Sequence, residues 1–520
     1  MIQALLVSGL TLILAYLTWV WGGLRVAWLP PAVWASCGLL VILLASAWMT
    51  ARSGASRSRP LWRDAFFYFG LLFLGYLAIQ WGNAGRVLYF DVGFSEWRYS
   101  QPPHAGWPSA FSRVESAQMV SWFFPAWVAG LTVRSPAVRR GAISGLLHGL
   151  VYSAGLLSIF GIVQFLTGTR LQYWLAPTGD GFFASFGYTN HAAAYFVLMG
   201  ALAAGFLYRE IFNVGPTGSR SVYRTVALVA SLVLCLVGAN LSLSRAGVIL
   251  AWALAGFVAV YGLIRGWNRL SAVKRLNLAV ATVAVLFVFY FAVAGFGKNE
   301  ILKEFEVRKP IHHRLFPVLD NVNLAMGGRL ELDVAAWRIW QDHKLLGIGG
   351  WGYRYLLALY LPPEEWKMIA QSPGKANVHC DILQFLAEFG VIGFGLMLAT
   401  GMALMGPLFL PAKYVRSECQ APVVTGVSPV DAARDGGYYR REKVSVPRRD
   451  PLWVMGVIGL SLVLVFSLID LPFRCPAILC TWVVILAALP RATEKENRVQ
   501  GSGFRKPAEA GDHQTSETIA

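Results

Sequence analysis

The chain has 520 residues, of which 56% are hydrophobic and only 14% are charged. A soluble domain carries about a quarter charged residues, so this composition indicates an integral membrane protein and excludes an ordinary soluble enzyme. The formal net charge is +17. In a membrane protein such an excess of Lys and Arg is typical of cytoplasmic loops. Since no nucleic-acid-binding motif accompanies it, we expect no nucleic-acid partner.

Apolar runs long enough to cross a bilayer recur along the chain. They predict an all-α membrane protein with about twelve transmembrane helices, near residues 2–21, 28–49, 65–81, 117–133, 142–166, 189–208, 226–243, 247–264, 277–296, 382–410, 452–469 and 473–489. The first run lacks a basic n-region and a small-residue cleavage site, so we expect it to be retained as a spanning helix.

Lys and Arg in the short loops set the predicted orientation. They cluster after the second, fourth, sixth and eighth runs, which places both termini in the cytoplasm. The predicted parts are an N-terminal bundle (1–296), a large extracytoplasmic loop (297–380), C-terminal helices (381–490) with a basic cytoplasmic loop (411–451), and a disordered tail (491–520). A further segment, 82–116, is rich in Trp, Tyr, Pro and Gly and is predicted to be an outer interfacial loop.

Polar residues that are far apart in sequence fall at the outer ends of the predicted helices: Asn190, Arg245, His379, Asp470 and Arg474. Chance placement would distribute such residues over both membrane faces. We therefore expect a polar cavity that opens away from the cytoplasm.

The tenth predicted helix carries three polar residues on one face, because Asp381, Gln384 and Glu388 have helical i, i+3, i+7 spacing. Glu388 lies roughly 13 Å deeper than His379 at about 1.5 Å per residue. An acid at that depth is costly in lipid, so it should face the protein interior and mark a functional site. The alternative is that Glu388 pairs with an arginine and only holds helices together.

The chemistry expected outside the membrane follows from the absence of a nucleotide pool there. A transferase at that face needs a substrate that is already activated, and a lipid-linked diphosphate has this property. Arginine binds phosphate oxygens through paired, charge-assisted hydrogen bonds, which favours Arg245 and Arg329 as ligands. His379 could act as the general base on an incoming hydroxyl. The alternatives are that His379 caps a helix and that Arg245 anchors the interface.

Several weaker patterns indicate structural rather than chemical roles. Glu331 and Asp333 form a short acidic pair, more typical of a solvated helix face than of a cation site. The glycine-rich run Gly347–Gly352 is more typical of a turn than of an anion cradle. The six cysteines match neither a zinc site nor a disulfide framework. We expect no metal and no cofactor.

Taken together, these motifs resemble the O-antigen ligase and polymerase superfamily of bacterial membrane glycosyltransferases. Ligases carry His, then Asn, Ser or Gln, nine residues, and Gly-x-x-Gly; here His379-Cys380 is followed by nine residues and Gly390-Val-Ile-Gly393. Cys380 departs from that pattern. Supporting segments are Gly328-Arg329 with Trp337, Asp342-His343 with Gly347-x-Gly349, Leu243-Ser-Arg-Ala-Gly247, and Gly187-Tyr-Thr-Asn190.

The resemblance implies metal-independent, inverting transfer of a glycan from an undecaprenyl diphosphate carrier to an acceptor hydroxyl, such as that of the lipid A core. The site would face outward from the cytoplasmic membrane. His379 would activate the acceptor, while Arg245 and Arg329 would bind the diphosphate, with Asn190 as a further substrate contact. Glu388 would position one of these cations or the histidine.

Alternatives within the family are a repeat-unit polymerase and an enzyme that transfers glycan to protein. A transporter of a polar lipid is the alternative from another class. Transporters are typically built from inverted repeats with broken helices at the midplane. The gathering of polar groups at one face and the long outer loop favour an enzyme.

Overall fold

The computed structural model describes residues 1–52, 61–93, 95–177, 181–212, 221–267, 283, 287, 329–361, 377–409 and 450–493. The helices are α1 (Ile2–Trp19), α2 (Pro30–Arg52), α3 (Ala65–Gly82), α4 (Arg113–Arg134), α5 (Arg140–Leu166), α6 (Thr189–Phe212), α7 (Val222–Leu241), α8 (Arg245–Trp267), α12 (Arg329–Asp342), α13 (Tyr353–Tyr360), α15 (Asp381–Phe409), α16 (Pro451–Phe466) and α17 (Pro476–Thr493). Two antiparallel hairpins, β1 (Leu88–Asp91) with β2 (Glu96–Tyr99) and β3 (Leu171–Gln172) with β4 (Ala176–Pro177), lie in the loops.

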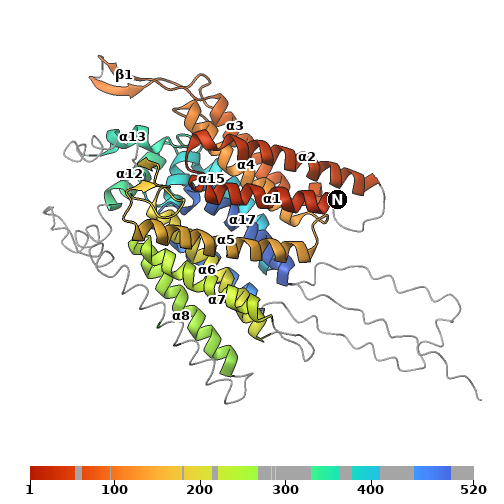
Figure 1. Ribbon diagram of the computed structural model, residues 1–520. Helices are drawn as coiled ribbons and strands as arrows, with labels where there is room; N and C mark the ends of the chain where they lie inside the picture. Colours follow the sequence, from red (N-terminus) through yellow and green to blue (C-terminus); the bar gives the residue numbers. More distant parts are fainter. Residues whose placement is uncertain are drawn as a thin grey trace, which may run out of the picture.

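Figure 1 shows the long helices running roughly side by side, with α12, α13 and the β1 hairpin gathered at one end. Within the described residues, nine helices are long and apolar enough to cross a membrane: α1, α2, α3, α5, α6, α7, α8, α15 and α17. The prediction of an all-α membrane protein is confirmed. The predicted ninth span (277–296) lies outside the described residues, apart from positions 283 and 287.

Two other predicted spans are present as helices but differ from the nine. α16 has only 16 residues, because the chain turns at Ser467 before the polar segment that precedes α17. α4 contains Pro125 and buries Trp122 and Trp127 among its neighbours. Both helices are therefore held by protein contacts more than by length and hydropathy.

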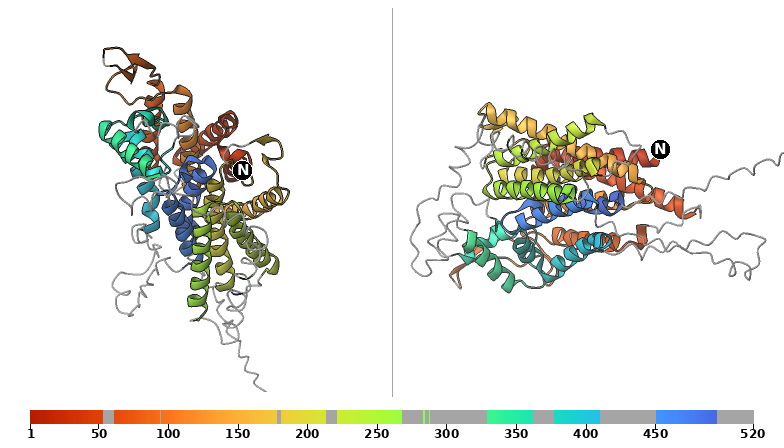
Figure 2. Two further views of the ribbon diagram at one scale, coloured as in Figure 1. Left: turned by 90° about the vertical axis from the view of Figure 1, so that its left-hand side faces the viewer. Right: turned by 90° about the horizontal axis from the view of Figure 1, so that it is seen from below.

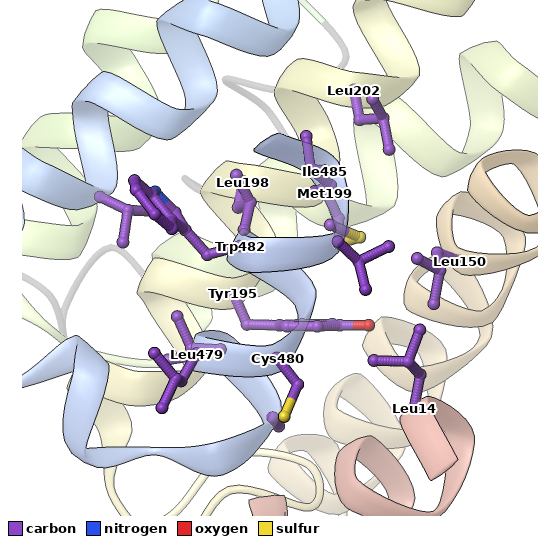
Figure 3. Packing of buried hydrophobic residues seen from close by; sticks show 14 of the residues in the cluster. Leu14, Leu150, Tyr195, Leu198, Met199, Leu202, Leu479, Cys480, Trp482 and Ile485 are labelled. Carbon is purple, nitrogen blue, oxygen red and sulfur yellow. The ribbon is translucent and has the colours of Figure 1, made fainter. Parts of the chain in front are cut away.

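α6 is the centre of the bundle, because its apolar window is buried all round. Small residues make this possible. A Cβ at Gly459 of α16 would lie 2.6 Å from the Cβ of Ala201 on α6, so the two helices touch closely. Figure 3 shows Tyr195, Leu198 and Met199 of α6 packed among side chains of α17, with Leu14 and Leu150 completing the cluster.

The end of the bundle opposite α12 and α13 is rich in paired basic residues. Arg134 at the end of α4 binds Asp64, which caps α3, through Nε at 2.6 Å and a second nitrogen at 2.9 Å. Arg491 at the end of α17 donates to the carbonyls of Val133, Ser135 and Val138. This end therefore carries basic helix termini. Figure 2 shows the opposite end, where α12 and α13 lie, from two further directions.

Candidate functional site

A buried carboxylate, Asp470, lies where the chain leaves α16 and enters the short 3-10 helix η8 (Pro472–Arg474). Asp470 is 1% exposed. The hydroxyl of Tyr188 donates to both of its oxygens, at 3.1 and 3.3 Å, and Asn190 Nδ2 donates to Oδ2. The amide of Leu471 donates to Oδ1 at 2.8 Å. The loop before α6 and the first turn of α6 thus hold Asp470 in one orientation.

Two cationic or basic side chains approach the same carboxylate from the segments preceding α15. Arg329, the first residue of α12, places a terminal nitrogen 3.5 Å from Oδ2 and donates from its other terminal nitrogen to the carbonyl of Ile469. His379 places Nδ1 3.5 Å from Oδ1, which is longer than a well-formed hydrogen bond. Each of these two side chains is 26% exposed. We name Asp470, Tyr188, Asn190, Arg329 and His379 the Asp470 cluster.

The charge state of the cluster follows from its neighbours. Burial alone would raise the pKa of Asp470, but His379, Arg329 and His191 together outweigh it and hold that pKa below its ordinary value. Burial and the negative charge of Asp470 raise the pKa of Tyr188 well above its usual range. Asp470 is therefore an anion at neutral pH, and Tyr188 is a neutral donor to it.

The backbone of His379 has a φ of 62°, a left-handed conformation that non-glycine residues adopt infrequently. The segment is fixed on both sides. The amide of Val378 donates to Gln384 Oε1 at 3.1 Å, and the amide of Asp381 donates to the carbonyl of Ser467 at 2.9 Å. Strain of this kind concentrates where a side chain must hold a particular position, and here the side chain is the imidazole beside Asp470.

Arg245 lies at the same end of the bundle, at the first residue of α8. Leu243 has a φ of 60°, and the hydroxyl of Ser244 accepts a hydrogen bond from the amide of Gly247 at 3.0 Å, which caps the helix. A Cβ at Gly247 would lie 2.2 Å from that of Ala193, so the start of α8 packs on the first turn of α6. Arg245 is exposed, and within the described chain it has no hydrogen bond or ion pair to the Asp470 cluster.

Glu388 belongs to a second group, which is closed. Its Oε2 accepts from Arg474 at 2.6 Å, and its Oε1 accepts from Gln384 Nε2 at 3.0 Å. The side chains of Glu388 and Arg474 are 0% and 2% exposed, and the rings of Trp351 and Phe385 cover the guanidinium at 4.5 and 4.7 Å. Among the described contacts, Glu388 therefore holds Arg474, as the alternative of a helix-joining pair predicts, and not His379, Arg245 or Arg329.

The glycines of the His379 signature, Gly390 and Gly393, lie where α15 breaks and contacts the loop after α12 and Tyr76. We call this region the α15 joint. Gly390 has φ 62° and ψ −175°, which breaks α15 two residues after Glu388. Into this break fits the loop after α12: the amides of Ile348 and Gly349 donate to the carbonyls of Ala387 and Glu388 at 3.2 and 2.8 Å. The interpretation of Gly347–Gly352 as a turn is therefore supported over that of an anion cradle, because these amides are occupied. α15 is not the continuous helix that the sequence predicts.

The same joint reaches α3. The hydroxyl of Tyr76 donates to the carbonyls of Leu346 and Phe389 at 2.6 and 2.8 Å. A Cβ at Gly393 would lie 2.4 Å from the ring of Tyr76. Gly393 thus provides the close helix contact predicted for this motif, whereas Gly390 provides the break.

Asp333 corrects the prediction of a solvated acidic face on α12. It is half-buried, and its Oδ1 is enclosed without a hydrogen-bond partner among the described residues. Burial raises its pKa to about 6, against the opposing effect of Arg329 and His379. Asp333 therefore adds a second carboxylate within electrostatic range of the cluster.

Cys380 follows His379 but has no activated thiol, because burial raises its pKa. Within the described residues, no group of three or more His, Cys, Asp or Glu side chains could hold a metal ion. The chemistry available is thus an imidazole, an anion that orients it, and guanidinium groups that can bind phosphate oxygens.

Sequence reasoning identified Asn190, Arg329 and His379, and the structure joins all three through Asp470. It placed Asp470 among the polar residues of an outer cavity without giving it a role, and it did not single out Tyr188. A role for Asp470 could have been suspected, since a lone acid between two apolar runs needs a partner. The pairing itself depends on contacts between residues far apart along the chain, such as Arg329 with Asp470 and Tyr188 with Asp470, which spacing does not reveal.

The bundle of apolar helices defines a polytopic membrane protein, and the polar, partly exposed Asp470 cluster lies at one end of it. Residues 230–398 match the family model of O-antigen ligase, Wzy_C. This match supports the resemblance to the O-antigen ligase superfamily that the motifs predict. The match includes Arg245, Arg329, His379 and Glu388, while Asn190 and Asp470 lie outside it. No curated protein matches the chain.

Proposed function

We propose that this membrane enzyme transfers a glycan from an undecaprenyl diphosphate carrier to an acceptor hydroxyl at the outer face of the cytoplasmic membrane. The family match supports an enzyme of the O-antigen ligase and polymerase type. The observation that carries the proposal is the convergence of His379 and Arg329 on buried Asp470, with both side chains still partly exposed.

In this proposal His379 is the general base. Its Nδ1 faces Asp470, which leaves Nε2 to take the proton from the acceptor hydroxyl. Asp470 stays ionised and stabilises the imidazolium that forms. Asp470 is thus a positioning residue, and Tyr188 and Asn190 fix its carboxylate.

The guanidinium groups handle the carrier. Arg329 and Arg245 bind the diphosphate, and Arg245 is helped by the N-terminus of α8, where the helix dipole favours an anion. The acceptor oxygen forms a bond to the anomeric carbon while the bond from that carbon to the phosphate oxygen breaks. The diphosphate leaves with the bonding electrons on the face opposite the attack, so the configuration inverts, and the arginines stabilise its growing charge.

The proposed orientation rests on the distribution of basic residues. Arg134, Arg209 and Arg491 lie at helix ends opposite the Asp470 cluster. Basic residues favour the cytoplasmic side, so the cluster would face outward. Attachment of a membrane-impermeant thiol reagent to a cysteine introduced at exposed Trp174 in intact cells tests this directly. Labelling only after the cells are broken would place the cluster on the cytoplasmic side.

The decisive assay supplies purified protein with a lipid-linked glycan and, separately, a lipid A core acceptor, a second lipid-linked glycan and an acceptor protein. Transfer to the lipid A core identifies a ligase, and elongation of the lipid-linked glycan alone identifies a polymerase. His379→Ala is expected to lower transfer by about 10²–10⁴-fold. The matched control is His104→Ala, because His104 is exposed in the loop before α4. Equal turnover by both variants would remove the general-base role.

A further inference from the structure

A cavity of about 710 Å³ lies outside the helix bundle, beside the β1 hairpin. One wall is formed by Arg86 together with β2 and the loop that follows it, and the other by the end of α12, the loop after it and α13. Figures 1 and 2 show this hairpin and α13 at the same end of the molecule as α12. The described residues that line it belong neither to the Asp470 cluster nor to the Glu388–Arg474 pair.

The cavity carries excess positive charge. Three basic side chains, Arg86, Arg98 and Lys344, line it against one carboxylate, Asp342. Two of these charges are already engaged: Arg98 lies 4.0 Å from Asp91, and Asp342 accepts a hydrogen bond from Tyr360 at 2.6 Å. The remaining positive charge belongs to Arg86 and exposed Lys344.

The surroundings of Arg86 favour the binding of an anion. It is half-buried, its terminal nitrogen donates to Ser109 Oγ at 2.6 Å, and its guanidinium lies 5.0 Å from the ring centre of Phe111. Its Nε is enclosed and has no hydrogen-bond partner in the described part of the chain. A desolvated guanidinium without a carboxylate partner is a costly arrangement that a bound carboxylate or phosphate relieves.

Aromatic rings form the rest of the lining. Trp97 and Trp107 are 53% and 60% exposed. Tyr99 lies deeper, where its hydroxyl donates to the carbonyl of Tyr355 at 3.1 Å and its ring meets Phe111 edge-on at 4.6 Å. Exposed flat rings in a concave polar site suit a ligand with apolar C–H faces and polar edges, which describes a sugar ring.

The cavity is connected through the backbone to the break in α15 at Gly390. The carbonyls of Lys344 and Leu345, in its wall, accept from the amides of Val391 and Ile392, just past the break in α15. On the other side of that break, the carbonyl of Glu388 accepts from Gly349. A ligand that moves this wall would therefore act directly on the joint that supports Arg474.

We propose that this cavity binds an acidic sugar of the glycan substrate, with its carboxylate or phosphate on Arg86 and Lys344 and its ring against Trp107. The proposal rests on the proposed glycosyl transfer for its biological context, but the cavity and its charge do not depend on it. The acidic sugar could belong to the carrier-linked donor or to the acceptor, because both must approach this face.

Binding is measured by calorimetry on the full-length protein in nanodiscs of phosphatidylcholine, with trigalacturonic acid as the probe and maltotriose as its neutral counterpart. We expect the acidic trisaccharide to bind at least about tenfold more tightly, and Arg86→Gln to weaken it about tenfold, as for loss of a charge-assisted hydrogen bond. The matched control is Arg113→Gln, which removes an exposed arginine outside the cavity. Equal affinity for both sugars, or wild-type affinity of Arg86→Gln, would overturn the proposal.

A second pair of variants distinguishes the loss of a ring contact from misfolding of the protein. Trp107→Ala should weaken binding of the acidic trisaccharide, and Trp107→Phe should restore most of it, because a phenyl ring still covers a sugar face. Loss in both variants would contradict ring stacking. Nanodiscs that contain phosphatidylglycerol supply the remaining outcome: competition by this lipid that depends on Arg86 would show that the cavity binds an anionic headgroup instead.

Transfer assays then separate donor from acceptor. With an acidic donor and a neutral acceptor, slower transfer by Arg86→Gln assigns the sugar to the donor; the reverse pairing assigns it to the acceptor. Arg86-dependent binding without any transfer by the wild type would contradict the proposed function but support the proposed sugar-binding cavity. Transfer without binding of the acidic trisaccharide would support the proposed function and contradict the sugar-binding cavity.

Discussion

The Asp470 cluster and the Glu388–Arg474 pair lie at the same end of the bundle and both set a buried carboxylate against an arginine. They differ in what remains accessible. Arg329 and His379 keep about a quarter of their side-chain surface exposed, whereas Arg474 is 2% exposed and lies under two aromatic rings. A buried acid at membrane depth marks a site when its partners still face a substrate, and marks a structural joint when aromatic side chains enclose them.

The largest effect on folding is expected from Glu388→Gln. The substitution removes the 2.6 Å ion pair of buried Arg474 and leaves only Asp381, 4.0 Å from its Nε, as an opposing charge. Loss of one partner of a buried pair costs up to about 3–5 kcal/mol. Thermal unfolding in detergent should show a large fall in midpoint, and Glu388→Gln combined with Arg474→Met should recover part of it. Wild-type stability of the single variant would mean that this pair is not a structural joint.

The break in α15 provides a test of nearly the same size. Gly390→Ala should destabilise the protein, because an added Cβ would lie 2.4 Å from the carbonyl oxygen of Leu345 and the residue has a φ of 62°. Gly395→Ala, in the same helix, has open space around its Cβ and should be neutral or slightly stabilising. Equal effects would show that the joint does not depend on the conformation of Gly390.

Arg245→Lys tests an accessible arginine, in contrast to the enclosed Arg474. We expect transfer to fall about tenfold, since a point charge cannot replace paired hydrogen bonds to phosphate, while the unfolding midpoint stays unchanged because Arg245 is exposed. Initial rates at varied donor concentration measure the effect. Full activity would make Arg245 an interface anchor.

The smallest effect concerns pH. Burial raises the pKa of Asp333 to about 6, above the value of about 3.9 for an unfolded chain. The folded state binds the proton more tightly between these values, so this residue's contribution to stability is lost as pH rises through that window. At pH values above about 6, Asp333→Asn should therefore unfold at a higher temperature than the wild type. Near pH 4 the two proteins should unfold at the same temperature. An equal shift at both values would contradict the role of ionisation.

Hydropathy alone predicted most of the fold, because a membrane restricts chains to helices of nearly fixed length. The break at Gly390 was not predictable, since a glycine in an apolar run is as compatible with a smooth helix surface as with a kink. In the site, Arg329 and His379 followed from their chemistry and from the motif. Asp470 did not, because its role depends on contacts between α12, the start of α15 and the end of α16.

The central claim is that Asp470 acts through His379. The most direct test is a double-mutant cycle on glycan transfer with Asp470→Asn, His379→Ala and the double variant, with membrane insertion verified for each. Residues that act as a unit are not additive, so we predict that Asp470→Asn lowers transfer in the wild type but has little further effect once His379 is alanine. Losses that multiply independently in the double variant would contradict the account.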